Sequence, residues 1–154
     1  MEDLIKILKE NRHLRNEDEV IKFDATLAEL PEQSGDDVAY VAQLFDVLVD
    51  DCDQPEVMWG LLHFAEDFDD ETYIAALLLS IDELSTKAKD WLEIILSRIL
   101  NNDDSKSQLI TASKNRSESE NIVMIKLLEN FKIDEEPELR DSATEVLNEL
   151  HQNS

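Results

Sequence analysis

Apolar residues recur at steps of three and four along almost the whole chain, which is the spacing of a helix face. The clearest runs cover residues 38–52, 55–68, 70–84 and 86–101, and each carries a continuous apolar stripe. No stretch of useful length alternates between apolar and polar residues, as a half-buried strand would. The spacing therefore predicts an all-α chain.

Weaker periodic runs predict five further helices, at residues 2–10, 17–30, 105–114, 117–132 and 137–150. Ser117 and Glu120 have the spacing of a capping box, in which two residues at a helix start bind each other's backbone N–H groups. The expected helices start about every 17 residues, or about 34 per helix pair, as in helical-repeat proteins.

This spacing predicts stacked antiparallel helix pairs, in a HEAT-like superhelical bundle or an irregular solenoid. A single globular helix bundle agrees equally well with the sequence, because short loops produce the same spacing. The chain has 154 residues, the length of one domain, so we expect residues 1–154 to form a single helical domain.

The chain is strongly acidic, with 37 Asp and Glu against 14 Lys and Arg, a net charge of −23. Such a charge repels phosphate groups, so we expect neither a nucleic-acid partner nor an anionic membrane partner. Residues 23–86 contain seventeen acids and no Lys or Arg, whereas the rest of the chain carries −6. Because this clustering is self-repulsive and ordinary surfaces intersperse lysines, it indicates a cationic partner. The alternative is a solubilising surface whose acids cap helix starts.

The residue types that catalysis or cofactors need are absent or isolated. The only glycines, Gly35 and Gly60, cannot form a phosphate-binding loop, and the lone Cys52 excludes a cysteine-based zinc site. Acidic neighbours and a place on an apolar face make Cys52 a small core residue rather than a nucleophile. The acid-rich loops lack the glycine and glutamate of a calcium loop. We therefore expect no enzyme activity, no cofactor and no metal.

Candidate partner-binding residues follow from the charge pattern and from one tryptophan. On the helix at 55–68, Trp59 points about 160° away from the core face centred near Leu61. It is expected to anchor a partner or to be covered by a second helix layer. The acids gather in two loops, which lie at opposite ends of neighbouring antiparallel helices. The candidate residues are Asp50, Asp51, Asp53, Trp59, His63, Glu66, Asp67, Asp69 and Asp70.

One long segment resembles a known family. The stretch DVAYVAQLFDVLVDDCDQPEVMWGLLHFAEDFDDETYIAALLLSIDEL, with its short helices, its VMWGLLHFAE core and its acidic loops, resembles the all-helical immunity proteins of bacterial polymorphic-toxin and contact-dependent growth inhibition systems. The resemblance covers residues 36–101. It implies a small acidic antitoxin in the cytoplasm, which also fits a lone cysteine and the lack of a signal-peptide pattern.

The resemblance further implies a single protein partner, a cognate basic toxin domain that is often a nuclease and that the immunity protein occludes without turnover. The free form is expected to be a monomer. An acidic segment on a helical scaffold would complement the basic groove of a nuclease. The alternative is an acidic DNA mimic, or another interaction module, that inhibits a nucleic-acid-binding protein.

Overall fold

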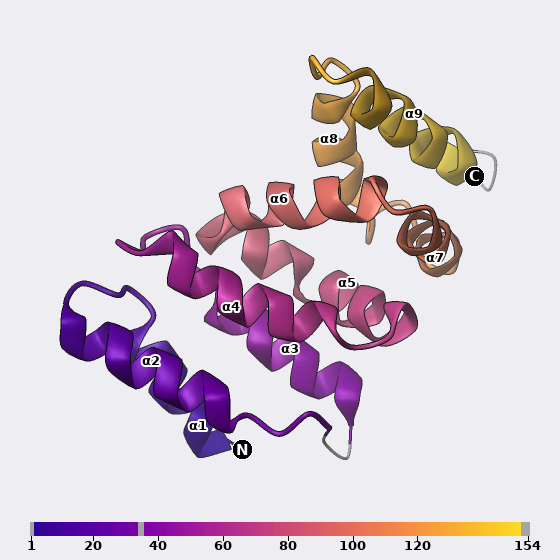
Figure 1. The fold of residues 1–154 in the computed structure, drawn as a ribbon. Helices are drawn as coiled ribbons and strands as arrows, with labels where there is room; N and C mark the ends of the chain where they lie inside the picture. The colour runs from indigo at the N-terminus through magenta and orange to yellow at the C-terminus, as the bar shows by residue number, and fades with distance from the viewer. Residues whose placement is uncertain (1, 34–35, 152–154) are drawn as a thin grey trace. The chain divides into compact units, whose positions relative to one another are not determined.

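The computed structural model describes residues 2–33 and 36–151, and within these ranges the chain forms nine α-helices and no strand. The predicted all-α class is therefore confirmed. The helices are α1 (Glu2–Asn11), α2 (Glu17–Glu29), α3 (Asp37–Val47), α4 (Pro55–Glu66), α5 (Asp70–Lys87), α6 (Lys89–Leu100), α7 (Asp103–Lys114), α8 (Ile122–Phe131) and α9 (Pro137–His151) (Figure 1).

The chain divides into two compact units, residues 1–91 and 92–154. Unit 1 holds 24 acids and 7 Lys or Arg, a net charge of −17, whereas unit 2 carries −6. Most of the excess acid therefore belongs to unit 1. The expectation that residues 1–154 fold as one domain stays a prediction.

The helices of unit 1 form two layers. Helix α3 packs on both α1 and α5, and α2 packs on α4, so that α2 and α4 lie in front of α1, α3 and α5 (Figure 1). Each helix also contacts the next along the chain from α3 to α5, as stacked antiparallel helix pairs do. Because directions alternate, the loops 12–16 and 48–54 lie at one end of this stack. The segments 30–33 and 67–69 lie at the other end.

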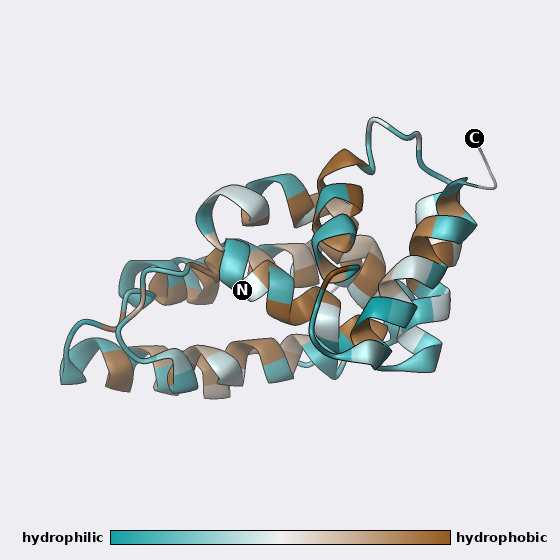
Figure 2. Cartoon of the chain, turned by 90° about the horizontal axis from the view of Figure 1, so that it is seen from above, coloured by the Kyte–Doolittle hydropathy of each residue, from teal (hydrophilic) through white to brown (hydrophobic). Residues whose placement is uncertain are grey.

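The core of unit 1 contains most of the apolar stripes that the spacing predicts, together with Tyr40, which the spacing does not place there. Tyr40, Phe45, Met58, Leu61 and Leu77 are all fully buried, and hydrophobic segments recur between hydrophilic ones along the helices (Figure 2). Burial of large side chains of this kind stabilises a fold by roughly 1.5–3 kcal/mol each.

One close approach between helices depends on a glycine. A Cβ atom at Gly60 would lie 3.0 Å from the Leu27 side chain, so the missing side chain lets α4 approach α2 closely. The other glycine, Gly35, lies outside the described residues.

Unit 2 is built from the later helices. Helix α9 packs against both α7 and α8, and it buries Leu139, Ala143, Val146 and Leu147 along one face. The capping box forms as predicted: the Ser117 N–H donates to Glu120 and the Glu120 N–H to the Ser117 hydroxyl, at 2.9 and 3.2 Å.

Several predicted helix ends are wrong. Helix α8 begins at Ile122 rather than at 117, because the capping box closes a turn that precedes the helix. Helix α5 continues to Lys87 and α6 begins at Lys89, because the backbone of Ala88 leaves the helical region between them.

The largest error concerns α3, which ends at Val47 and not at residue 52. Leu48 is extended, and the following backbone bonds to other segments. The Asp50 N–H donates to the Lys87 carbonyl, and the Asp53 N–H to the His13 carbonyl. Leu48 and Val49 are nevertheless buried, so they keep the apolar pattern of a helix without being helical.

Candidate partner-binding surface

The loop 48–54 connects α3 to α4 and carries Asp50, Asp51 and Asp53. Arg15, from the α1–α2 loop, binds both Asp51 and Asp53, at 2.6 and 2.9 Å. The hydrogen bond from Arg15 lowers the pKa of Asp51. His13 adds a contact of 2.7 Å between its Nδ1 atom and the Asp51 carbonyl oxygen. These acids are exposed, but an arginine of the same chain already neutralises two of them.

Arg15 and His13 reach this loop because of an unusual backbone between them. Leu14 has a φ of 50°, in the left-handed region that bulky residues rarely adopt. Its side chain is fully buried, which holds the turn in place while the two neighbouring side chains face residues 51–53.

Asp50 has a different role. Its carboxylate accepts hydrogen bonds from the backbone N–H groups of Asp90 and Trp91, at 2.9 and 3.3 Å. These groups lie in the first turn of α6, where backbone donors lack partners inside the helix. Asp50 therefore caps α6 from a distant loop.

Asp46, in α3, is the most strongly bound acid of this end. Lys9 from α1 and Lys87 from the end of α5 both form ion pairs with its carboxylate. Burial alone would raise the pKa of Asp46, but the hydrogen bonds from Lys87 and Lys9 outweigh it and lower the pKa to about 2. Residues 23–86 contain no Lys or Arg. The fold nevertheless brings Lys and Arg from outside that range to some of its acids.

The second group of acids lies at the other end of α4. Asp69 caps α5 by accepting a hydrogen bond of 2.8 Å from the Thr72 N–H, which lowers the pKa of Asp69. Asp67 is the exposed C-cap residue of α4, and Asp70 lies in the first turn of α5. Helix α4 has 12 residues and is about 18 Å long, so the two acidic loops are separate, as the alternation of loops predicts.

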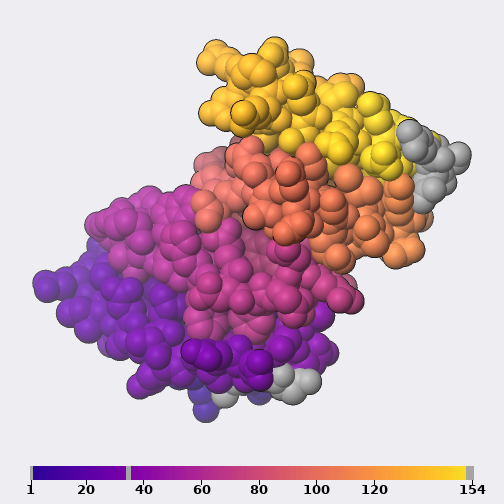
Figure 3. Space-filling view, turned by 45° about the vertical axis from the view of Figure 1, so that its right-hand side comes forward, coloured from indigo at the N-terminus to yellow at the C-terminus, as the bar shows by residue number. Residues whose placement is uncertain are grey.

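A groove of about 420 Å³ opens at this second end of α4, and we call it the acidic groove. Its lining combines acids with two half-buried aromatic rings, which we call its floor, and we call the acids its rim. The residues that line it are Glu32, Gln33, Asp37, Phe64, Asp67, Phe68 and Asp69. In Figure 3 the violet atoms of the α2–α3 segment lie against the magenta atoms of the α4–α5 segment. The groove thus joins two predicted acids, Asp67 and Asp69, to residues that the sequence did not single out.

Trp59 lies on another face of α4 and is half-buried. Its ring stacks on His63 at 5.5 Å and meets the ring of Trp91 edge-on at 5.3 Å. Trp91 is buried, and its indole N–H donates to the Val49 carbonyl. The Trp59 ring therefore contacts two rings of its own chain while the residue is only half-buried, and its role as an anchor for a partner stays a prediction.

His63 and Glu66 continue this face. The exposed His63 ring lies 3.4 Å from the Glu66 carboxylate. The structure therefore arranges the candidate residues in three places: the loop 48–54, the Trp59–His63–Glu66 face, and the acidic groove with Asp70 beside it. Arg15, Glu32 and Phe64 were missed, because their neighbours are distant in sequence.

The described residues include one cysteine, Cys52, and no metal-binding cluster of side chains. No group of three or more His, Cys, Asp or Glu side chains in these residues is arranged to hold a metal ion. Burial raises the pKa of the half-buried Cys52 thiol, so the nucleophilic thiolate is disfavoured. No described helix has both the length and the apolar composition that crossing a membrane requires.

Comparison with known proteins gives the family of the chain. No curated protein and no solved structure matches the chain. The family model of Immunity protein 30 matches residues 10–109, about two thirds of the chain, and it extends beyond the resemblance at 36–101 on both sides. The matched range includes both acidic loops, Trp59 and the acidic groove. The chain therefore belongs to the Immunity protein 30 family, the immunity proteins of polymorphic toxin systems.

Proposed function

We propose that this protein is a cytoplasmic antitoxin that binds a basic toxin domain, most simply a nuclease, and occludes it without catalysing a reaction. The family supplies the class of partner, a toxin. The observation that carries the proposal is the charge of unit 1, a net −17. A nuclease presents a cationic surface to nucleic acid, and such a surface complements an acidic one.

The three places on unit 1 have distinct roles in this proposal. Trp59 and His63 form an amphipathic contact of the kind that anchors protein interfaces. The acids around the groove attract the partner and orient it. The loop 48–54 contributes less, because Arg15 already compensates Asp51 and Asp53. The antitoxin itself is a monomer before it binds.

The test is to express the toxin domain encoded beside this gene, with and without this protein. Growth should stop with the toxin alone and resume when both are present. The purified pair should form a one-to-one complex, and nucleic-acid cleavage by the toxin should cease at equimolar antitoxin. Growth arrest that persists despite soluble antitoxin would refute the function. A neutralised toxin without nuclease activity would refute only the proposed toxin class.

A further inference from the structure

We propose that the acidic groove is the docking site for one cationic side chain of the toxin, and that arginine fits it best. The inference rests on the proposed function, to which it adds a place and a chemical contact. Among the described residues that line the groove, Glu32, Asp37, Asp67 and Asp69 are acids and none is a lysine or arginine.

The floor of the groove suits a guanidinium group. Phe64 and Phe68 are half-buried and meet edge-on, with their ring centres 6.0 Å apart. Arginine stacks on aromatic rings while its N–H groups bind carboxylates, and a compact ammonium group does this less well. The volume of about 420 Å³ lies within the range of ligand-binding clefts, which accommodates the end of an arginine side chain.

The groove is held in shape before any partner arrives. Tyr40 packs edge-on against Phe68 at 5.6 Å and against Phe64 at 6.3 Å. Its hydroxyl donates a hydrogen bond of 2.5 Å to the Pro31 carbonyl, which ties the aromatic floor to the α2–α3 segment. A preformed site loses little conformational entropy on binding.

A comparison of the two ends of unit 1 also favours a cationic side chain as the occupant of the groove. At the opposite end, Lys9 and Lys87 bind Asp46, and Arg15 binds Asp51 and Asp53. The chain thus supplies its own cations to the acids there. No lysine or arginine lines the groove beside Glu32 and Asp67 among the described residues, and a partner that brings a cation would complete the same arrangement there.

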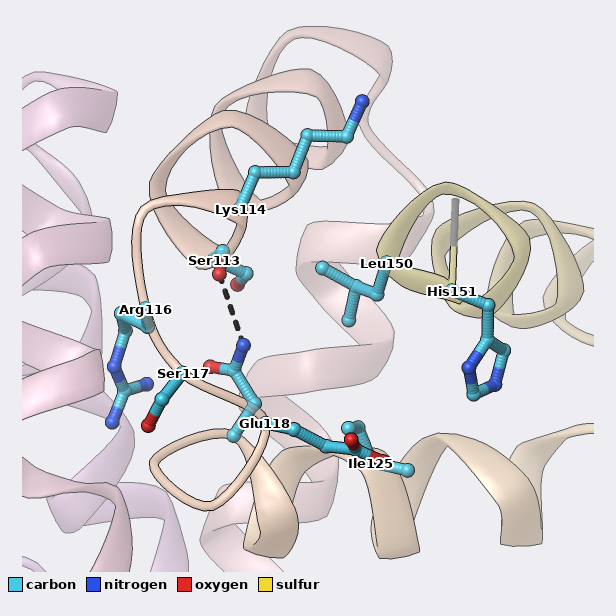
Figure 4. A pocket seen from close by; sticks show the side chains of 9 residues that line it. Ser113, Lys114, Arg116, Ser117, Glu118, Ile125, Leu150 and His151 are labelled. Carbon is cyan, nitrogen blue, oxygen red and sulfur yellow. Dashed lines mark hydrogen bonds between the residues drawn. The ribbon is translucent and has the colours of Figure 1, made fainter. Parts of the chain in front are cut away.

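Another cavity of comparable size does not share these features. It measures about 370 Å³, lies in unit 2 and is lined by both acidic and basic residues (Figure 4). Lys114 points away from the other lining side chains in Figure 4 and binds Glu149 at 2.9 Å. Asn121 spans the cavity wall by donating to the Ser113 carbonyl at 2.9 Å. The charged residues that line this cavity are therefore partly paired within the chain.

The first experiment compares two double variants in binding to the toxin domain encoded beside this gene. Glu32→Gln with Asp67→Asn removes two charges from the groove rim. Asp82→Asn with Glu83→Gln removes two charges from exposed positions of α5, about 18 Å along the helix from its start. Both double variants lose two negative charges, so the long-range attraction between the protein and a basic toxin falls equally in the two. We expect the groove variant to raise Kd at least about tenfold and the α5 variant less than about threefold.

The outcomes separate the two proposals. Equal loss in both variants would overturn the groove assignment and leave the toxin partner established. Absence of binding by the unaltered protein would overturn the proposed function and this inference together.

The second experiment needs no toxin. The protein labelled with ¹⁵N is titrated with the peptide acetyl-Gly-Arg-Gly-amide and with its uncharged citrulline counterpart. We expect the arginine peptide to shift the amide signals of Phe64, Asp67 and Phe68, and to lose this effect in the groove variant. Shifts spread evenly over the acids of unit 1, or equal shifts from citrulline, would overturn the proposal.

Discussion

At the scale of single residues, Asp46 shows how the protein manages its own charge. Its pKa is about 2 in the folded protein, below the ordinary value of 3.8. A carboxylate whose pKa is lowered on folding stabilises the fold at every pH above its ordinary pKa. This contribution disappears as the pH falls from about 4 towards 2. The side chain is 35% exposed, so solvent screening reduces the effect.

We predict that Asp46→Asn lowers the free energy of unfolding by about 1 kcal/mol at neutral pH. Urea denaturation at pH 7 measures this loss, and the difference from the unaltered protein should shrink below pH 3. Asp24→Asn is the matched control, since Asp24 is exposed in the same unit. A loss that is independent of pH would contradict the ion-pair explanation.

A substitution at Trp59 distinguishes a role in partner binding from a role in packing. Part of its ring is exposed and part rests on Trp91. We predict that Trp59→Ala speeds dissociation of the toxin complex at least about tenfold, with a stability loss of only about 1 kcal/mol. Surface plasmon resonance and thermal unfolding give the two values. Ile133→Ala, at an exposed position of unit 2, should change neither. A lower melting temperature with an unchanged dissociation rate would make Trp59 a packing residue alone.

At the scale of elements, Asp50 lies in the loop 48–54 but stabilises the start of α6. It caps α6 through the N–H groups of Asp90 and Trp91. We predict that Asp50→Ala costs about 1 kcal/mol of stability, whereas Asp50→Asn costs less because asparagine also caps helices. Urea denaturation ranks the two variants. Suppose instead that Asp50→Ala leaves stability unchanged but slows toxin association more than Glu56→Gln does. Asp50 would then be an interface residue.

The helices themselves could be predicted from the sequence, because each buries an apolar stripe at helical spacing. Their ends could not always be predicted. Leu48 and Val49 continue the stripe of α3, but the backbone beyond them bonds to Lys87 and His13, which no local pattern indicates. The groove was missed for a similar reason. The spacing places Phe68 on the core face and leaves Phe64 out, and only the fold brings Glu32 beside both rings.

At the scale of the whole molecule, the proposed attraction between antitoxin and toxin rests on net charge. A net charge of −23 attracts a basic partner and repels itself. We predict that toxin association slows at least about tenfold as salt rises from about 50 to about 500 mM, since the Debye length shortens from about 14 to about 4 Å. Stopped-flow fluorescence measures the rate.

The free protein provides the internal control. Its melting temperature should rise over the same range, because salt screens repulsion among the acids. An association rate that does not respond to salt would place the binding energy in apolar contacts instead.

Substitutions of the acids near the two ends of α4 have different consequences for the rest of the chain. A change at Asp51 or Asp53 removes one of the two carboxylates that hold Arg15, so it calls for a second change elsewhere in the chain. A change at Glu32 or Asp67 disturbs no lysine or arginine of the groove lining. If the groove binds the toxin as proposed, recognition of a new toxin variant can evolve there one substitution at a time, while the Arg15 contacts at the opposite end stay unchanged.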